Sequence, residues 1–542
     1  MYLTPCYIML LQQVTSSQFI DLHIVVLECM IGLREMENLE LQTKKELSSL
    51  SLEWSYAYAD SSDKYASSER GMQNRAVFEK LQPHDSLEIL CIKNYAGVDF
   101  PRWMSLLPNL VQLKIVGMQF EYLHLDQFQN LKELFLSRVQ FAHLHLNGLQ
   151  NLIELSLSGL KFGHLHIDQL QNLRELKVSG VEFQHLHLER LQNITELKLS
   201  EKRFERLQID QLQNLKELKF SSVEFGHLHL ERLQSITKLE LCKKQFEHLH
   251  LVQLENLRQL YLFTVKFECV VLHQLQNLEE LHLSQIESQK SNKPVCIECS
   301  QPLRKLQKIV MTKIINKGLQ ISMQGGEGDK NLFPGLQHLE MELCENLRFQ
   351  PSIPRSTHYI ISGEIYFDNF NYRRILGSFL FPSFKQVMGT SIPGSTSRME
   401  IKNTSGLSSE RWKSIPHLEL LNITELTIDK CVDSCPVPKC ILGWKSLQKL
   451  EIRRCEDIEL LPEWLGEMSC LTELIVETYW MEALHPCIRR LTNLQSLTLI
   501  TCLNRFKERC KSGDDWINIK HIPHIQITDR NGRTEIISPS CT

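Results

Sequence analysis

The stretch FAHLHLNGLQNLIELSLSGLKFGHLHIDQLQNLRELKVSG, residues 141–180, contains two copies of a unit that repeats every 21 residues. The unit reads L-Q-N-L-x-E-L-x-L-S-x-V-x-F-x-H-L-H-L-x-x. Its third position forms a column in which one serine replaces asparagine: Asn109, Asn130, Asn151, Asn172, Asn193, Asn214, Ser235, Asn256 and Asn277. A phenylalanine column keeps the same step: Phe120, Phe141, Phe162, Phe183, Phe204, Phe225, Phe246 and Phe267. This period predicts an elongated array of stacked repeats.

Each unit contains L-x-x-L-x-L, which is typical of the leucine-rich repeat at the short end of its length range. Alternation along a strand places Leu134 and Leu136 inward and leaves Glu133, Phe135 and Ser137 outward. The predicted fold class is therefore an α/β solenoid, a leucine-rich-repeat horseshoe with a parallel β-sheet on the concave face. We expect the phenylalanine column to fill the interior. The H-L-H triplet should form a second extended stretch on the opposite wall, with both histidines outward.

The second half of the chain repeats less regularly. Copies that begin at Ile423, Leu447, Leu471 and Leu494 are separated by 24, 24 and 23 residues, and an isolated copy begins at Leu336. We predict an N-terminal segment at 1–46, read as a partial repeat or a truncated start, and a repeat block at 47–285 with the 21-residue units from about 109. An irregular insert with isolated repeats at 286–409, a C-terminal repeat block at 410–527 and a tail at 528–542 follow.

One position of the repeat carries cysteine in the less regular copies: Cys344, Cys431, Cys455 and Cys502. It should point inward, where the thiol can donate to a backbone carbonyl of a neighbouring copy. In the 21-residue block the same position is apolar at Val139, Leu160, Val181, Val223 and Val265. Lys202 and Lys244 break this pattern, and because a fully buried lysine is rare, we expect a local bulge or a lysine head that reaches solvent.

The histidines raise the question of a metal site. One column contains His143, His164, His185, His227 and His248, and the other contains His124, His145, His166, His187, His229 and His250. Neighbouring copies could offer four imidazoles to zinc, but no copy supplies a cysteine or carboxylate ligand at a fixed place. We favour a solvated histidine surface multiplied by duplication. The single Cys296-x-x-Cys299 has no second pair, so a metal or redox role for it is the weaker interpretation.

Composition excludes several classes of function. A net charge of −4 gives no electrostatic reason to expect nucleic acid or an acidic membrane as a partner. Residues 1–33 are apolar but lack a basic start and are interrupted by polar residues, so we expect neither a signal peptide nor a membrane span. The 17 cysteines are then thiols of the cytoplasm or nucleus. The glycines at 325–330 lack the spacing of a phosphate loop, and no catalytic motif is present, so we expect no enzyme and no cofactor.

Stretches outside the 21-residue block carry specific motifs. They are KKELSSLSLEW (44–54), the segment 81–113 with Tyr95-x-Gly97 and Phe100-Pro101-x-Trp103, FPGLQHLEMELCENLRFQPSIP (333–354), LPEWLGEMSCLTELIV (461–476) and ERCKSGDDWINIKHIPHIQI (508–527). Together they resemble the leucine-rich-repeat region of plant intracellular immune receptors, the coiled-coil nucleotide-binding leucine-rich-repeat class of grasses. The nucleotide-binding module and the helical N-terminal signalling domain of that class are missing here.

The resemblance implies a protein partner: a pathogen effector, a guarded host protein or a nucleotide-binding module. Independently, the repeats predict a large open surface, and its candidate contact residues are the outward strand positions Glu133, Phe135, Glu154, Glu175, Lys177, Lys198, Lys219, Tyr261 and His282. The aromatic residues Phe135 and Tyr261 are the best candidates, because exposed aromatics often anchor interfaces. The alternatives are an intracellular scaffold, such as a substrate-recruiting subunit of a ubiquitin ligase, and a truncated, non-functional receptor fragment.

Overall fold

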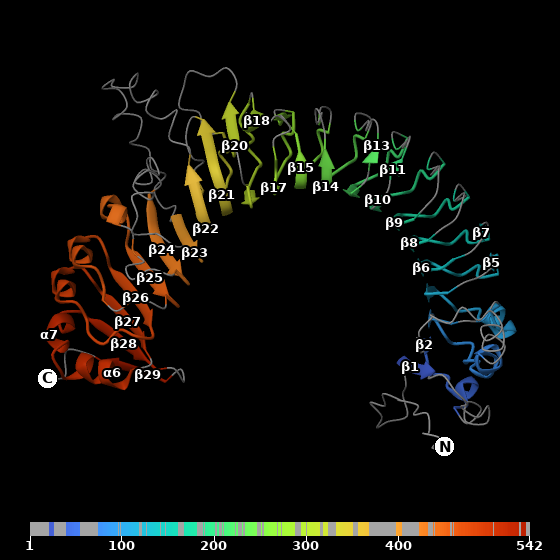
Figure 1. Cartoon of the computed structure of the whole chain (residues 1–542), viewed down its shortest axis with the longest axis horizontal. Coiled ribbons are helices and arrows are strands. Elements are labelled where there is room, and N and C mark those ends of the chain that lie inside the picture. Colours follow the sequence, from blue (N-terminus) through green and yellow to red (C-terminus); the bar gives the residue numbers. More distant parts are fainter. Residues whose placement is uncertain are drawn as a thin grey trace, which may run out of the picture. The chain divides into compact units, whose positions relative to one another are not determined.

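The structure of the chain is a computed structural model (Figure 1). It describes residues 21–26, 39–54, 74–367, 397–403, 422–529 and 533–537, apart from 96, 98, 119–121, 126, 141–142, 147, 161–166, 168, 182–187, 189, 201–202, 205–208, 210, 223, 226–229, 231–232, 246–250, 252–253, 268, 273, 288–293, 300, 315–317, 324–331, 351–355, 432–436, 438, 456–457, 459 and 502. The chain divides into two units, Met1–Lys244 and Gln245–Thr542. We call them unit 1 and unit 2.

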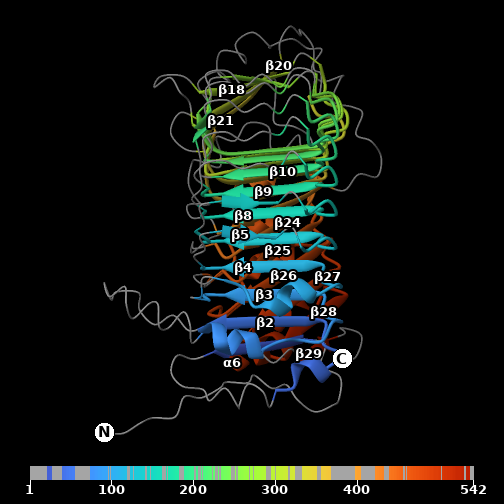
Figure 2. The same ribbon diagram turned by 90° about the vertical axis from the view of Figure 1, so that its right-hand side faces the viewer.

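Unit 1 is built on a sheet of short parallel strands. In spatial order they are β1 (Asp21–Val26), β2 (Ser49–Trp54), β3 (Ile89–Lys93), β4 (Gln112–Val116), β6 (Glu133–Ser137), β8 (Glu154–Ser158), β9 (Glu175–Ser179), β10 (Glu196–Ser200), β12 (Glu217–Ser221) and β14 (Lys238–Gln245). Figure 2 shows the strands β2, β3, β4, β8, β9 and β10 stacked one above another. Equivalent residues of successive repeats are Cα partners, so the sheet is in register from repeat to repeat.

The leucine pattern explains this stack. Leu134 and Leu136 are buried, whereas Glu133 and Phe135 on the same strand are half-buried and point to the opposite side. Each buried leucine contributes roughly 1.5–3 kcal/mol relative to an exposed one. The predicted leucine-rich-repeat solenoid is confirmed. The repeat position that carries cysteine in the less regular copies was predicted to point inward. This is confirmed by the residues at that position in the 21-residue block that are buried: Val139, Leu160, Val181 and Val265.

The asparagine column joins consecutive repeats of unit 1. The side-chain amide of Asn130 donates to the carbonyl of Pro108 at 2.6 Å, and that of Asn172 donates to Gln150 at 2.8 Å. Asn109, Asn151, Asn193 and Asn214 make the equivalent bond. Each amide therefore satisfies a carbonyl in the turn of the preceding copy, which no strand bond can reach.

The second wall of unit 1 has little helix. Two short strands, β5 (Tyr122–His124) and β7 (His143–His145), pair in parallel, and two more, β11 (Arg203–Phe204) and β13 (Glu224–Phe225), form another pair. The buried Leu144 confirms the inward leucine predicted for that H-L-H triplet. Helical structure is limited to 74–80 and to the 3-10 turns η1 (Leu41–Thr43) and η2 (Arg102–Leu106) among the described residues of this unit.

Several predictions for this wall lie outside the described residues. The histidine side chains of both columns are among them, as are Lys202, the side chain of Lys244 and the phenylalanine side chains from Phe120 to Phe246. In unit 2, Phe267 is fully buried, which confirms the inward position of that column in one copy.

An aromatic cluster fills the first repeats of unit 1. Phe78 packs edge-on against Trp54, Tyr95 and Trp103, with ring centroids 5.2, 4.9 and 5.4 Å apart. The indole nitrogen of Trp103 donates to the carbonyl of Phe78 at 3.0 Å. Gly97 lies directly on the Tyr95 ring, because a Cβ at this position would meet the tyrosine oxygen at 2.1 Å. The Tyr95-x-Gly97 and Trp103 motifs therefore have a packing role.

Unit 2 has the same type of architecture, with some longer strands. Its main sheet consists of β15 (Gln259–Lys266), β17 (Glu280–Ser284), β19 (Lys308–Thr312), β21 (His338–Gln350), β22 (His358–Phe367), β23 (Ser397–Lys402), β24 (Ile423–Asp429), β25 (Lys449–Arg453), β26 (Glu473–Thr478), β27 (Ser496–Thr501) and β28 (His524–Thr528), all parallel. The antiparallel strand β29 (Thr534–Ile537) pairs with β28. The segment 286–409, which we expected to be an irregular insert with isolated repeats, contributes the strands β19, β21, β22 and β23 to this sheet.

The other wall of unit 2 holds a second parallel sheet. It contains β16 (Cys269–Val271), β18 (Val295–Cys299), β20 (Leu319–Met323) and the last residues of β21. Farther along, the wall is made of the 3-10 turns η4 (Lys439–Gly443), η5 (Glu463–Glu467) and η6 (Pro486–Arg490) and the helices α6 (Asn504–Lys511) and α7 (Trp516–Ile519). No helix of the described residues is long and apolar enough to cross a membrane.

The inward cysteines of unit 2 behave as predicted. Cys344, Cys431 and Cys455 are fully buried. The thiol of Cys344 lies 3.3 Å from the carbonyl oxygen of Met311 on the neighbouring strand. Burial raises the pKa of Cys344 to about 11, so this thiol stays protonated and can donate. Cys502 lies outside the described residues.

Candidate functional site

The outward face of the unit 1 sheet carries three rows of side chains, one from each outward strand position. The in-register pairing stacks like residues about 4.8 Å apart. The first row is Glu133, Glu154, Glu175, Glu196 and Glu217. The middle row is Lys114, Phe135, Ser156, Lys177, Lys198, Lys219 and Glu240, and the third is Ser137, Ser158, Ser179, Ser200 and Ser221.

Three lysines of the middle row form ion pairs with glutamates of the first and middle rows. The ammonium nitrogen of Lys177 lies 2.6 Å from a carboxylate oxygen of Glu154 and 3.1 Å from one of Glu175. Burial alone would lower the pKa of Lys177, but the hydrogen bonds to the two glutamates outweigh burial and raise it to about 12. Lys198 pairs with Glu196, and Lys219 pairs with Glu240 at 2.6 Å. The predicted contact residues Glu154, Glu175, Lys177, Lys198 and Lys219 are thus already engaged within the chain.

The environment of Phe135 is different. A hollow of about 510 Å³ opens at the carboxyl ends of strands β2 to β8. We call it the Phe135 hollow, and it is lined by Glu53, Lys93, Asn94, Lys114, Val116, Phe135, Leu136, Ser137, Arg138, Ser156 and Ser158. Phe135 is half-buried here, on strand β6. Of the nine predicted contact residues, only Phe135 lines this hollow.

Two cations of the Phe135 hollow have no counter-ion among the described residues. Lys93 is bonded to Glu53 at 3.0 Å, and this hydrogen bond is the main reason that the pKa of Glu53 is lowered. By contrast, Lys114 and Arg138 form no ion pair with any described residue. The side-chain oxygen of Asn94 is also buried without a hydrogen-bond partner among the described residues. The hollow therefore presents an excess of positive charge beside an aromatic ring.

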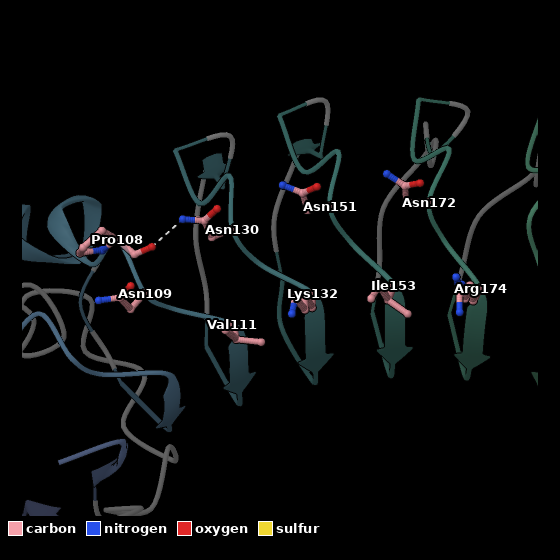
Figure 3. Close-up of a pocket in the computed structure, with 9 residues that line it drawn as sticks. All are labelled: Pro108, Asn109, Val111, Asn130, Lys132, Asn151, Ile153, Asn172 and Arg174. Carbon is pink, nitrogen blue, oxygen red and sulfur yellow. Dashed lines mark hydrogen bonds between the residues drawn. The ribbon is translucent and has the colours of Figure 1, made fainter. Parts of the chain in front are cut away.

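A second depression lies at the amino ends of the strands in unit 1. This asparagine groove has a volume of about 530 Å³ and is lined by Pro108, Asn109, Val111, Asn130, Lys132, Asn151, Ile153, Asn172 and Arg174. Figure 3 shows its two rows: the asparagines along one side, and Val111, Lys132, Ile153 and Arg174 along the other. The amide nitrogens of the asparagines are used in the bonds between repeats. The groove is mixed in character, with two exposed cations and two half-buried aliphatic side chains.

Tyr261 and His282 lie in unit 2, on the neighbouring strands β15 and β17. Their rings stack with centroids 4.4 Å apart, and the Tyr261 hydroxyl donates to Glu280 at 3.0 Å. The Nε2 atom of His282 lies 3.4 Å from Glu280 but makes no hydrogen bond within the described residues. Burial lowers the pKa of His282, so it is neutral at pH 7. The two rings cover each other, and neither is a freely projecting anchor.

Sequence reasoning missed Lys114 and Arg138. Lys114 follows Leu113 as Phe135 follows Leu134, so extending the repeat back by one copy finds it. Arg138 has a φ of 52°, in the turn position where the next two copies have Gly159 and Gly180. The alternation of a strand does not apply in this turn, so no sequence pattern indicated the direction of Arg138. The last of the predicted contact residues, Glu133, accepts a hydrogen bond at 2.9 Å from the side-chain amide of Gln112.

The described residues contain no group of three or more His, Cys, Asp and Glu side chains that could hold a metal ion. The side chains of Cys296 and Cys299 lie on opposite faces of the strand β18. Cys299 is fully buried, whereas Cys296 is half-buried on the opposite side of β18, because residues three apart on a strand face opposite ways. These two thiols cannot bind one ligand together.

Comparisons with known proteins agree with the repeat architecture. Residues 8–139 match the family model described as R13L1/DRL21 LRRs. Over 89 residues the chain is 34% identical to a putative disease resistance RPP13-like protein 1 of Arabidopsis thaliana, a match that covers 16% of this chain and only 8% of that protein. The chain is thus a leucine-rich-repeat protein that is similar, over part of its length, to a plant disease-resistance protein.

Among the solved structures that are similar to this chain, two illustrate the low sequence identity. A leucine-rich-repeat protein of Leptospira interrogans is 19% identical with a TM-score of 0.32, and the match covers 89% of this chain and 91% of that one. A plant peptide hormone receptor, RGFR1 in complex with RGF2, is 13% identical with a TM-score of 0.33, and the match covers 92% of this chain and 80% of that one.

Proposed function

We propose that this chain is a protein-recognition solenoid of plant innate immunity, acting in the cytoplasm or nucleus. It binds a pathogen effector, a guarded host protein or a nucleotide-binding module and catalyses no reaction itself. The observation that carries the proposal is the Phe135 hollow, where an aromatic ring lies beside two cations that form no ion pair with the described residues. The segment 8–139, which matches the leucine-rich-repeat model, includes most of this hollow.

The charge of the hollow favours one kind of partner surface. Lys114 and Arg138 can form charge-assisted hydrogen bonds with carboxylates, and Phe135 can bury an apolar side chain beside them. The hydroxyls of Ser137, Ser156 and Ser158 supply further hydrogen bonds at the rim. An acidic segment with a neighbouring apolar residue therefore fits the hollow best. The neutralised rows of β9, β10 and β12 offer less, because a partner must first compete with internal ion pairs.

A charge-reversal experiment tests this proposal. The full chain would be co-expressed with a nucleotide-binding module of a plant disease-resistance protein. In a separate experiment, the purified chain would be used to capture partners from plant extract. The double variant Lys114→Glu, Arg138→Glu should weaken binding at least tenfold, because it places two like charges against an acidic segment. Phe135→Ser should weaken binding without unfolding the chain, with a change in stability within about 1 kcal/mol.

The matched control is Lys132→Glu, Arg174→Glu in the asparagine groove. It reverses the same number of exposed cations in the same unit, at the other end of the strands. We expect it to leave binding unchanged. Equal loss from both double variants would indicate a non-specific charge effect, and loss from the control alone would move the recognition site to the asparagine groove.

A further inference from the structure

The second sheet of unit 2 brings two cysteines from different repeats into direct contact range. Cys269 on β16 and Cys296 on β18 are Cα partners in the parallel pairing. Their neighbours Val270 and Ile297 are each 1% exposed and point into the core. Cys269 and Cys296 therefore share the outward face of this wall, and both are half-buried.

This placement matches the requirements of a disulfide. Register partners on adjacent strands are about 4.8 Å apart. Disulfides span Cα separations of about 4.4–6.8 Å, and their Cβ atoms must point the same way. Same-face register partners satisfy both conditions with only a small local adjustment of the two strands.

Apart from Cys470, which is also half-buried, the other cysteines of unit 2 whose side chains are described differ from this pair in their access to solutes. Cys344, Cys431 and Cys455 are 0% exposed, and their thiols lie against backbone carbonyls of the main sheet. Cys299 is also 0% exposed, on the inner side of β18. A small oxidant in solution can reach Cys269 and Cys296 without opening the core.

We propose that Cys269 and Cys296 are a reversible oxidative modification site, at which a hydroperoxide converts the two thiols into a disulfide that links consecutive turns of the second wall. In the first step, one sulfur attacks a peroxide oxygen, the O–O bond breaks, and the leaving oxygen takes a proton as water or an alcohol. In the second step, the other sulfur attacks the sulfenic acid formed, the S–S bond forms, and water leaves. Two electrons and two protons pass to the peroxide, and a dithiol reductant reverses the change.

The surroundings of the pair set how fast it reacts. The pKa of Cys269 is raised to about 11, chiefly by burial and then by the charge of Glu298 on β18. The facing residues of β20, Gln320 and Ser322, are uncharged. Because the thiolate is the nucleophile, the pair should react slowly at pH 7 and faster as the pH rises. The site thus responds to sustained rather than brief oxidant exposure.

The test uses the full chain treated with hydrogen peroxide at several pH values, followed by alkylation, proteolysis and mass spectrometry without reductant. We expect one cross-linked peptide pair that joins Cys269 to Cys296, a yield that increases with pH, and loss of the cross-link after dithiothreitol. Cys344, Cys431 and Cys455 should be alkylated only after unfolding. Separate alkylation of Cys269 and Cys296 after oxidation, or links only between molecules, would overturn the proposal.

Two variants sharpen the result. Cys296→Ser should prevent the cross-link and leave Cys269 as a sulfenic acid that dimedone traps, whereas Cys431→Ser should leave the cross-link intact. Glu298→Gln removes the negative charge beside Cys269 and should increase the rate at pH 7 several-fold. An unchanged rate in this last variant would contradict the role assigned to Glu298, and the peptide map of the unaltered chain decides the proposal even if a variant fails to fold.

Discussion

Lys177 reduces the repulsion between two neighbouring glutamates of unit 1. It bridges Glu154 and Glu175, which stand on adjacent strands in register. Its pKa is raised from the ordinary value of 10.5 to about 12, so folding favours the charged form. The resulting stabilisation is fully present below pH 10.5 and is lost as the pH rises through 12.

We therefore predict that Lys177→Met lowers stability at neutral pH by about 1 kcal/mol, since a partly exposed ion pair contributes little more than that. The same variant should lose less stability than the unaltered chain between pH 10.5 and 12, because the group that titrates there is gone. Urea unfolding at a series of pH values measures both effects. Lys132→Met, which removes an exposed lysine with no ion pair among the described residues, is the control and should follow the unaltered chain.

Single side chains also mark the limit of sequence-based prediction. Alternation placed Phe135 on the outward face, and the structure agrees. Whether an outward lysine is paired depends on side-chain directions across two strands, which is why Lys177 and Lys114 have different environments in equivalent positions. Arg138 could not be placed at all, since its turn has a positive φ.

At the scale of repeat elements, the asparagine column is a set of identical links with one substitution. Asn193 and Asn214 each donate to the turn of the preceding copy, at 2.8 and 2.9 Å. Ser235 occupies the next place in this column, and its side chain is too short to make the same bond. The link between the turn that contains Ser235 and the turn of the preceding copy is therefore weaker than the links between the earlier copies.

We predict that Ser235→Asn stabilises this part of unit 1 by about 0.5–1 kcal/mol, the net value of one hydrogen bond. Asn193→Ser should destabilise its own turn by a similar amount. Because repeat arrays open locally, native-state hydrogen exchange of the strands β12 and β14 is the suitable measurement for the first variant, and of β9 and β10 for the second. If protection in β12 and β14 is unchanged by Ser235→Asn, the column contributes nothing at this position.

At the scale of the whole molecule, the fold was predictable because its signal is local and repeated. Leu134 and Leu136 define a strand by alternation, and the step of 21 residues defines the stacking. The strands β18 to β23 were harder to predict, since long loops between them break the period. The candidate site could not be predicted from the sequence, because the residues that line the Phe135 hollow come from five strands. Its excess positive charge also depends on which side chains form ion pairs with each other, which only the structure shows.

A prediction at this scale concerns ligands of the purified chain. We expect neither ATP nor zinc to raise its melting temperature. No phosphate loop occurs in the sequence, and no copy of the repeat adds a cysteine or carboxylate ligand to the histidines at a fixed place. Calorimetry and thermal shift measure both. Micromolar ATP binding that is abolished by changes around Gly325, or a zinc effect that is abolished by His164→Gln with His166→Gln, would prove the respective expectation wrong.

The in-register stacking of unit 1 also has a genetic consequence. Recombination that adds or removes one whole copy inserts or deletes one strand with all its neighbours still aligned, so the leucine core and the outward rows stay in phase. Insertion or deletion of a single residue within a strand would instead turn the later side chains of that strand to the other face. Alleles that differ by complete copies can thus lengthen or shorten the outward face one strand at a time. Point substitutions at outward positions instead alter what this face binds.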